Sequence, residues 1–164
     1  MLTKFTKSDI PRLLCWIPDA RFVMQWAGKN YTFENLNEHL ITDINKSESS
    51  NMPHNMLYNF LTDTKQVAGH IQLPRINYEE KSARIGRVLI DKKYRGLGLG
   101  KKMMNELIDA SFNSLNLKKL SLAVFDFNKS AYELYKRLGF VQYEKRIQLF
   151  ESEEWTCIEM VLLK

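Results

Sequence analysis

A glycine-rich stretch near the middle of the chain carries the clearest chemical signal. Residues 88–101 read Val-Leu-Ile-Asp-Lys-Lys-Tyr-Arg-Gly-Leu-Gly-Leu-Gly-Lys, an order typical of a strand, a tight turn and the start of a helix. Glycines allow several backbone N–H groups to converge on an anion, and the helix adds about half a positive charge at its N-terminus. Arg95, Lys101 and Lys102 supply full charges nearby. The stretch therefore predicts a pyrophosphate site.

Two common phosphate-binding motifs do not fit the spacing of these glycines. A Walker A loop requires GxxxxGK[ST], whereas the glycines here stand at alternate positions 96, 98 and 100. The dinucleotide fingerprint requires GxGxxG in the first turn of a parallel βαβ unit, whereas this turn follows an antiparallel pattern. Hydrolysis of ATP or GTP and dinucleotide binding are therefore disfavoured. A turn in which the glycines serve only the backbone is the structural alternative.

The turn resembles a known family signature. Arg95 to Gly100 fits the acyl-CoA motif R/Q-x-x-G-x-G/A of the GCN5-related N-acetyltransferases, the GNAT family. Further along the chain, the pattern N-x-x-A-x-x-x-Y-x-x-x-G-F of the same family is matched by Asn128, Ala131, Tyr135, Gly139 and Phe140. Either motif alone could be accidental, but the two in this order are specific.

The resemblance implies a binding mode for acetyl-CoA as co-substrate, without a metal. The backbone of residues 88–90 would hold the pantetheine arm where their strand splays from the next one, and residues 95–101 would bind the pyrophosphate. Asn128 would contact the pantetheine while also capping its helix, with Ser130 assisting. The implied cofactor-binding residues are Val88, Leu89, Ile90, Arg95, Gly96, Leu97, Gly98, Leu99, Gly100, Lys101, Asn128 and Ser130.

The resemblance also implies direct attack of an amine on the acetyl thioester, without a covalent acyl-enzyme. Tyr135 matches the family tyrosine that faces the departing sulfur and is the expected general acid. A phenol with a pKa of about 10 would transfer its proton to a thiolate of pKa about 8.5 only at a cost of about 2 kcal/mol. A hydrogen bond that strengthens as charge develops on sulfur is therefore sufficient. The structural alternative is an aromatic core residue at helical spacing.

No general base follows from the sequence. Some relatives carry a glutamate on the strand before the glycine turn, but this chain has Arg84, Gly86 and Arg87 there. A base or a water chain is still needed, because a primary amine is mostly protonated at neutral pH. The candidates, none of them assigned, are His70, Glu79, Glu80, Glu151, Glu153 and Glu154.

The acceptor amine is only broadly indicated, as a peptide or protein N-terminus or a small-molecule amine. The outline of the N-terminal helices and the C-terminal hairpin is similar to the branch that acetylates ribosomal-protein amino termini. Residues 15–18 and 22–28, with Tyr31 and Phe33, could form a wall of the acceptor site, or else belong to the core. The polar loop expected at 45–55 could cover it.

The order of predicted elements indicates an α/β fold. We expect a mixed, mostly antiparallel sheet of about seven strands, flanked by four or five helices, with the splayed central strands forming the acyl-CoA cleft that the resemblance implies. The expected strands are 2–5, 56–61, 67–73, 83–90, 119–125, 140–150 and 155–163. Helices are expected after a cap at Ser8, at 19–27, at 33–44, after the glycine turn as far as Leu115, and after Asn128.

Composition limits the remaining function classes. The 164 residues suit one domain, 1–164, and no run of apolar residues could span a membrane. The net charge of +5 is spread along the chain, which disfavours nucleic acid as a partner. Cys15 and Cys157 have no disulfide or zinc spacing, which predicts a cytoplasmic protein with Cys15 buried.

Two alternatives stay open beside an acetyl-CoA-dependent N-acetyltransferase. One is a noncatalytic acyl-CoA sensor that has kept the turn, although retention of Tyr135 speaks against it. Another is a nucleotide- or nucleic-acid-binding module that uses Arg95, Lys101 and Lys102. A homodimer is compatible with each reading.

Overall fold

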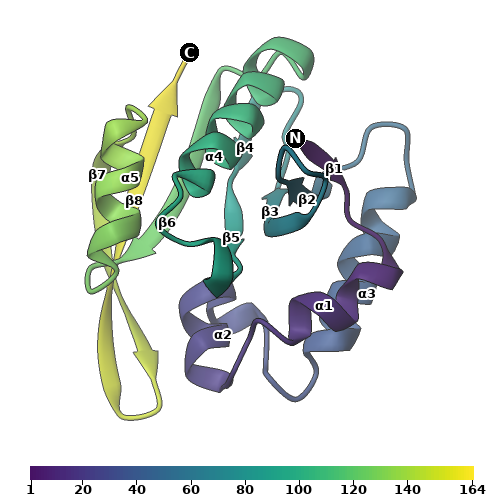
Figure 1. Ribbon diagram of the computed structural model, residues 1–164. Coiled ribbons are helices and arrows are strands. Elements are labelled where there is room, and N and C mark those ends of the chain that lie inside the picture. The colour runs from purple at the N-terminus through teal and green to yellow at the C-terminus, as the bar shows by residue number, and fades with distance from the viewer.

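Eight strands form two four-stranded sheets in the computed structural model, which describes all 164 residues (Figure 1). One sheet has the order β1-β2-β3-β5 and the other the order β4-β6-β8-β7. All neighbours are antiparallel except β4 and β6, which are parallel. The strands are β1 (Leu2–Lys4), β2 (Asn55–Leu61), β3 (Val67–Pro74), β4 (Ser82–Arg84), β5 (Gly86–Ile90), β6 (Lys119–Phe125), β7 (Val141–Phe150) and β8 (Glu153–Leu163).

Five α-helices surround the sheets: α1 (Ile10–Leu14), α2 (Ala20–Ala27), α3 (Leu36–Glu48), α4 (Leu99–Asp109) and α5 (Lys129–Arg137). A π-helical turn, Ala110–Ser114, continues α4. Three 3₁₀ turns lie at Lys7–Asp9, Gly28–Asn30 and Lys92–Tyr94. In Figure 1, α4 and α5 lie on the same side of the sheets, whereas α1 to α3 gather around the other end of the first sheet.

The two sheets are joined through one chain segment, β4 followed by β5. Its first part pairs with β6, ending at the hydrogen bond from the Ile85 N–H to the Ser121 carbonyl, 2.7 Å. Its second part leaves β6 and pairs only with β3. The edge of β5 that faces β6 is therefore unpaired, and the two sheets splay apart from this point. The predicted splayed central strands are confirmed.

Each helical layer has its own hydrophobic core. The larger core lies under α4 and α5, where Met103, Met104 and Leu107 of α4 are fully buried with Tyr135 of α5. These α4 positions share one face of the helix, as the sequence pattern predicts. The second core, which includes Leu40 of α3, packs α1, α2 and α3 against the first sheet. Both layers hold β5 between them.

The predicted fold class is confirmed, with local differences. There are eight strands rather than about seven because the strand expected at 83–90 is divided at Ile85. Residues 45–48 continue α3 and are not loop, since nothing after Ile44 breaks the helix. Thr6, not Ser8, begins the first helical turn through a capping box with Asp9.

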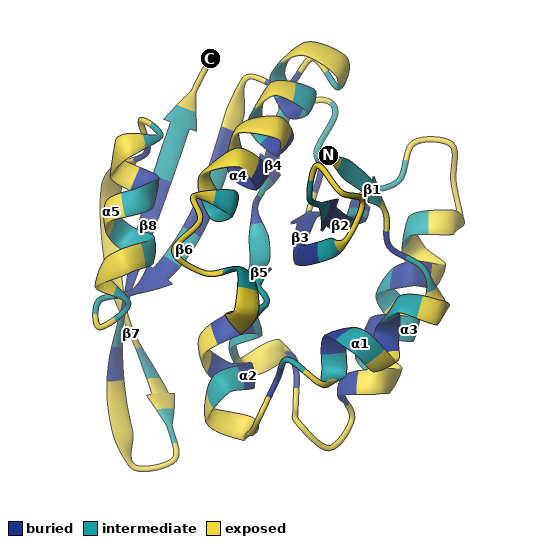
Figure 2. Ribbon diagram, in the orientation of Figure 1, coloured by how far each residue is buried: buried dark blue, intermediate teal, exposed yellow.

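The exposure of the two cysteines and of the outer strand β7 completes the description of the fold. Cys15 is exposed at the end of α1 rather than buried, while Cys157 is buried and both are free thiols. The outer strand β7 is mostly exposed (Figure 2), including its apolar residues Val141, Ile147 and Leu149. None of the helices has the length and hydropathy needed to cross a membrane.

Candidate active site

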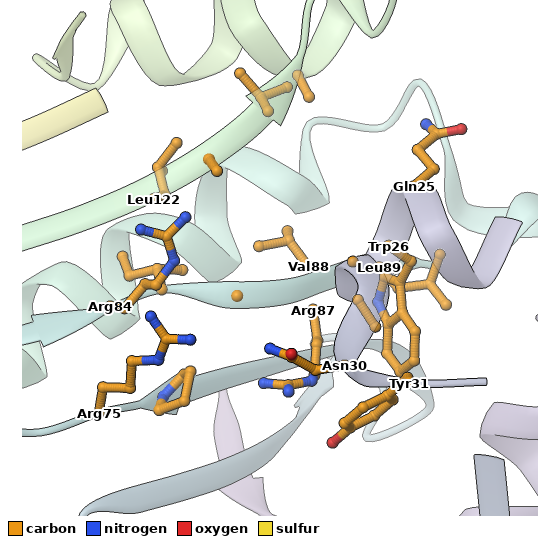
Figure 3. A pocket seen from close by; sticks show the side chains of 18 of the residues that line it. Gln25, Trp26, Asn30, Tyr31, Arg75, Arg84, Arg87, Val88, Leu89 and Leu122 are labelled. Atoms are coloured by element: carbon orange, nitrogen blue, oxygen red, sulfur yellow. The ribbon is translucent and has the colours of Figure 1, made fainter. Parts of the chain in front are cut away.

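A cavity of about 1220 Å³ occupies the gap where the two sheets splay (Figure 3). It is lined on one side by Gly86–Ile90 and on the other by residues 122–125 of β6. One end, which we call the glycine end, is formed by Arg95, Gly100, Asn128 and Tyr135. The other, the arginine end, contains Arg75, Arg84, Arg87 and Arg146. The first end is built around a glycine turn and the second around charged side chains.

The glycine turn presents unpaired backbone donors. Gly96 and Gly98 have φ values of 79° and 74°, a region that side chains rarely adopt, and Gly98 caps α4 in this conformation. As a result, none of the six N–H groups from Gly96 to Lys101 donates a hydrogen bond within the protein. The Arg95 Nε–H donates to the Ile90 carbonyl at 3.1 Å and ties the turn to the end of β5. Such a group of donors at a helix N-terminus can hold a phosphate or pyrophosphate.

The strand that leads into the turn carries a bulge. Between its pairs Gly86 with Gln72 and Leu89 with His70, β5 contributes two residues where β3 contributes one. Arg87, one of those two residues, has a φ of 52°, which is strained for a residue with a side chain. The bulge twists β5 away from β6 and directs the Arg87 side chain into the cavity. The cleft therefore has a local backbone cause.

Tyr135 is buried in the larger core and also lines the cavity. Its ring packs edge-on against Phe140, with centroids 6.2 Å apart, and its hydroxyl makes no hydrogen bond within the protein. Burial raises the pKa of Tyr135 to about 12. The phenol is therefore neutral throughout the physiological range and keeps a proton with which it can donate a hydrogen bond.

Asn128 caps α5 and also lines the cavity. Its Oδ1 accepts from the Ala131 N–H at 3.4 Å and from Ser130 Oγ at 3.3 Å, so it caps α5. Its Nδ2 has no partner in the protein, and Asn128 lines the cavity. The side chain can thus cap the helix through its oxygen and donate to a ligand through its nitrogen.

The structure brings the predicted residues into one region. Eight of them line the cavity directly: Val88, Leu89, Ile90, Arg95, Gly100, Asn128, Ser130 and Tyr135. Gly96, Leu97, Gly98, Leu99 and Lys101 belong to the adjoining turn but not to the lining itself. Leu97 is 66% exposed, so its contribution is limited to its backbone.

The arginine end begins at a three-residue group that joins α3 to β5. The Tyr31 hydroxyl donates to Asp43 Oδ2, and the Arg87 guanidinium lies 4.3 Å from the centre of the Tyr31 ring. Arg87 Nη2 is 3.9 Å from Asp43 Oδ2, while the buried Arg87 Nε has no partner. Burial raises the pKa of Tyr31 far above its usual value, with Asp43 adding to the effect. Tyr31 is therefore neutral, and Asp43 and Arg87 compensate each other's charge.

A second ion pair crosses from β4 to β8. Arg84 holds the buried Glu159 with two hydrogen bonds of 2.8 and 3.1 Å, and Arg146 Nη2 is 3.4 Å from the same carboxylate. Burying a carboxylate is tolerated only where such partners are present. The sequence does not indicate a role for Glu159, Asp43 or Arg146, because their positions depend on contacts between distant segments. For Arg84, the sequence offers only the alternation of side chains along a strand, which places Arg84 on the opposite face of the sheet from the buried Ala83.

The base candidates from the sequence do not line the cavity. His70 is fully buried beside Phe5 and Gln72, and burial lowers its pKa to about 3. Glu153 is bound by Arg21 at 2.7 and 2.9 Å, which lowers the pKa of Glu153 to about 2. The two carboxylates that do line the cavity are Asp43 and Glu159.

Part of the expected wall is also present. Phe22, Trp26 and Tyr31 line the cavity, whereas residues 15–18 and Phe33 do not. Ser49, Ser50 and residues 53–55, which come from the segment after α3, complete the same side.

Comparisons with known proteins agree with this architecture. The model of the acetyltransferase (GNAT) family matches residues 20–140. The chain is 36% identical over 78 residues to a spermidine N(1)-acetyltransferase of Vibrio cholerae, covering 48% of this chain and 44% of the relative. It is 34% identical over 70 residues to a thialysine N-epsilon-acetyltransferase of Bos taurus, covering 43% and 37%. The chain thus spans less than half the length of these curated relatives.

A solved structure extends the likeness to the whole fold. The Vibrio cholerae spermidine N-acetyltransferase, solved in complex with CoA and spermine, superposes with a TM-score of 0.80 at 23% identity, covering 99% of this chain and 94% of that one. At this identity the likeness establishes the fold. Since the family model covers well over half of the sequence, the chain belongs to the acetyltransferase (GNAT) family.

Proposed function

We propose that this protein is an N-acetyltransferase that moves the acetyl group of acetyl-CoA directly onto a primary amine. The observation that carries the proposal is the glycine end of the cavity. Six free backbone N–H groups stand there beside the unpaired edge of β5, and the Tyr135 hydroxyl, without a protein partner, belongs to a residue lining the same space. These groups suit a ligand with a pyrophosphate at one end and a reactive thioester at the other.

The proposed cofactor contacts follow the order of the chain. Residues 95–101 bind the pyrophosphate, and the free edge of β5 at Val88, Leu89 and Ile90 pairs with the amide groups of the pantetheine arm. Asn128 donates to that arm through the Nδ2 atom that has no protein partner. N–H groups near Leu89 and Ile90 polarise the thioester carbonyl and stabilise the oxyanion formed during attack.

In the proposed reaction the amine nitrogen attacks the carbonyl carbon, and the carbon–sulfur bond then breaks. Proximity supplies much of the rate enhancement, because both reactants are held in one cleft. Full proton transfer from Tyr135, with its pKa of about 12, to a thiolate of pKa about 8.5 would cost roughly 5 kcal/mol of free energy. Tyr135 therefore donates a hydrogen bond to the departing sulfur, which takes its proton from solvent.

The attacking amine must also lose a proton. Because Asp43 and Glu159 are the carboxylates lining the cavity and both are paired with arginine, a water molecule is the proposed carrier of that proton. Asp43 is the better placed of the two to accept a proton from such a water, since it lies beside β5, where it is hydrogen-bonded by Tyr31.

We propose a small-molecule amine as the acceptor. The names of the relatives specify spermidine and thialysine, and residues of α2 and α3 line the cavity. Amino termini of ribosomal proteins are the second class of acceptor that the same assay tests. The reducing, cytoplasmic compartment predicted from the two cysteines stays a prediction.

The test is release of free CoA thiol from acetyl-CoA in the presence of a panel of diamines, polyamines, amino acids, aminoglycosides and short peptides, with products identified by mass. We expect an added mass of one acetyl group on at least one amine. Binding of acetyl-CoA without transfer to any amine would favour the sensor alternative. Absence of acetyl-CoA binding at millimolar concentration, together with salt-dependent affinity for nucleic acid, would contradict the proposal.

A further inference from the structure

We propose that the acceptor amine carries an anionic group, a carboxylate or a phosphate, and that Arg75 binds this group with Arg84 and Lys119 beside it. The inference rests on the proposed function and narrows its substrate class. It begins from the charges around the cavity: seven of the lining residues are lysine or arginine and two are carboxylates. A site with this balance repels a polycation and attracts an anion.

Neither carboxylate is free to receive a cationic tail. Glu159 accepts two hydrogen bonds from Arg84 and lies within 3.4 Å of Arg146. Asp43 accepts from Tyr31 and faces Arg87. An ammonium group at the far end of a diamine would therefore meet arginines whose charges are only partly compensated. Recognising such a group would require breaking one of these pairs, at a cost that a carboxylate-bearing ligand does not incur.

Among the four arginines of this end, Arg75 is the one without a partner. It follows β3, it is exposed, and it forms no ion pair or hydrogen bond within the protein. Arg75 and Arg84 both line the large cavity and the small one, and Figure 3 shows them at the same end of the pocket, with the β4–β5 ribbon between their guanidinium groups in this view. Two cations that line one space favour an anion within it.

A small second cavity of about 160 Å³ meets the large one at these two arginines. Its other lining residues are Ser82, Ala83, Lys119 and Ser121, so it holds three cations, two hydroxyls and no carboxylate. The parallel register of β4 and β6 pairs Ser82 with Lys119 and Arg84 with Ser121, which places these four side chains on one face of the sheet. Outside the lining, Glu159 binds Arg84 at 2.8 Å and the exposed Glu80 lies 3.5 Å from Ser82 Oγ, whereas Arg75 and Lys119 have no acidic partner. The lining offers both charge and hydroxyl donors to a small anion.

These cations do not serve the cofactor phosphates. The glycine turn follows Ile90, whereas Arg84 lies six residues earlier on the β4–β5 segment, about 20 Å away along an extended strand. Arg95, Lys101 and Lys102 already supply charge beside the turn. The thioester would lie between the two regions, near Leu89. An acceptor reaching from there to Arg75 must carry its anionic group several bonds from its amine.

The experiment compares acceptors that differ only in their far end. With acetyl-CoA saturating, thiol release is measured for 6-aminohexanoate, 6-aminohexyl phosphate, hexane-1,6-diamine and hexylamine, and for shorter and longer homologues. We expect kcat/KM to be at least about tenfold higher for an anionic member than for the diamine of equal length. The carboxylate and phosphate arms identify which anion is used.

Variants at Arg75 connect the preference to the site. Arg75→Gln should narrow the ratio of kcat/KM between the anionic amine and the diamine, and Arg75→Glu should reverse it. Arg137→Gln is the matched control, because Arg137 is an exposed arginine of α5 outside both cavities. Preference for the diamine, or equal changes in the Arg75 and Arg137 variants, would overturn the inference while leaving the acetyltransferase intact.

A binding measurement distinguishes failure of this inference from failure of the proposed function. The CoA-saturated protein is titrated with 6-acetamidohexanoate and with mono-acetylated hexane-1,6-diamine. Tighter binding of the former is expected even for a poorly turned-over acceptor, whereas equal binding or binding of neither would overturn the inference. Absence of CoA binding in the same calorimeter would instead overturn the proposed function.

Discussion

The glycine end and the arginine end of one cavity are built by opposite means. At the glycine end, consecutive residues 96–101 supply backbone donors, and their conformation depends on two glycines with positive φ. At the arginine end, side chains from β4, β5, α3, β7 and β8 meet across long sequence separations. The first end can bind the part of a cosubstrate shared by a whole family, whereas the second can change with a few substitutions. Separating cofactor binding from acceptor choice in this way lets one fold use many amines.

The largest effect is expected at the glycine end, at Tyr135. Tyr135→Phe removes the hydroxyl that we propose to face the departing sulfur and should lower kcat by about a hundredfold, the lower end of the range for proton-donating groups. Its affinity for acetyl-CoA, measured by calorimetry, should stay the same. Tyr132→Phe on the same helix, which does not line the cavity, is the control. Unchanged turnover in the Tyr135 variant would remove this residue from the reaction.

At the arginine end, stability should depend on the buried carboxylate. Glu159 is 3% exposed, and Glu159→Gln leaves Arg84 and Arg146 without their shared anion. We expect a loss of about 2 kcal/mol in the free energy of unfolding, measured with urea. Glu133→Gln, which removes an exposed pair with Lys136, should cost about 0.5 kcal/mol or less. Equal losses in the two variants would show that Glu159 is not a structural anchor.

A matched pair of glycine substitutions compares the two ends directly. Gly98 at the turn and Gly28 after α2 both have positive φ, and a Cβ atom at either would meet nothing within 4 Å. Gly98→Ala therefore imposes backbone strain of about 1 to 2 kcal/mol in the left-handed helical region, and Gly28→Ala, with φ 70° and ψ −172°, imposes at least as much. Only the former should weaken acetyl-CoA binding, by about tenfold, because only that turn cradles the pyrophosphate. A similar loss in both would indicate a general effect of strain.

The smallest effect concerns pH and the buried His70 under the arginine end. Burial, with Arg87 contributing, lowers the pKa of His70 to about 3, whereas an unfolded histidine titrates near 6.5. Between these values the unfolded chain binds a proton that the native protein does not, so stability falls as pH falls below about 6.5. His70→Gln should make the unfolding temperature less dependent on pH between 7 and 5. An unchanged pH dependence would show that other groups cause the loss of stability at low pH.

The sequence was most informative where the structure is local. The motif from Arg95 to Gly100 predicts both the turn and the helix that follows, because glycine spacing and helix capping act within a few residues. Asn128 and Tyr135 are found in the expected region for the same reason, since both belong to one short helix and its cap. At Ile85 the strand expected over 83–90 is divided, and its two parts pair with different strands, β6 and β3.

What the sequence did not predict depends on register between distant strands. Glu159 reaches Arg84 only because β6 stands between β4 and β8, with Glu159 opposite Ala123. The positive φ of Arg87 is equally invisible in its residue type, since an arginine carries no preference for that conformation. His70 and Glu153 were plausible bases by type, yet one is enclosed in the core and the other is held by Arg21.

The most direct test of the account is to follow the backbone amide signals of the protein by NMR while CoA is added. The account predicts that the largest shifts fall on residues 95–101, on 88–90 and on 128–131. Amides of Arg75, Ser82 and Lys119 should respond only when an anionic amine is added afterwards. Shifts that CoA produces mainly at Arg75, Arg84 and Lys119, with the glycine turn unaffected, would contradict the assignment of the two ends.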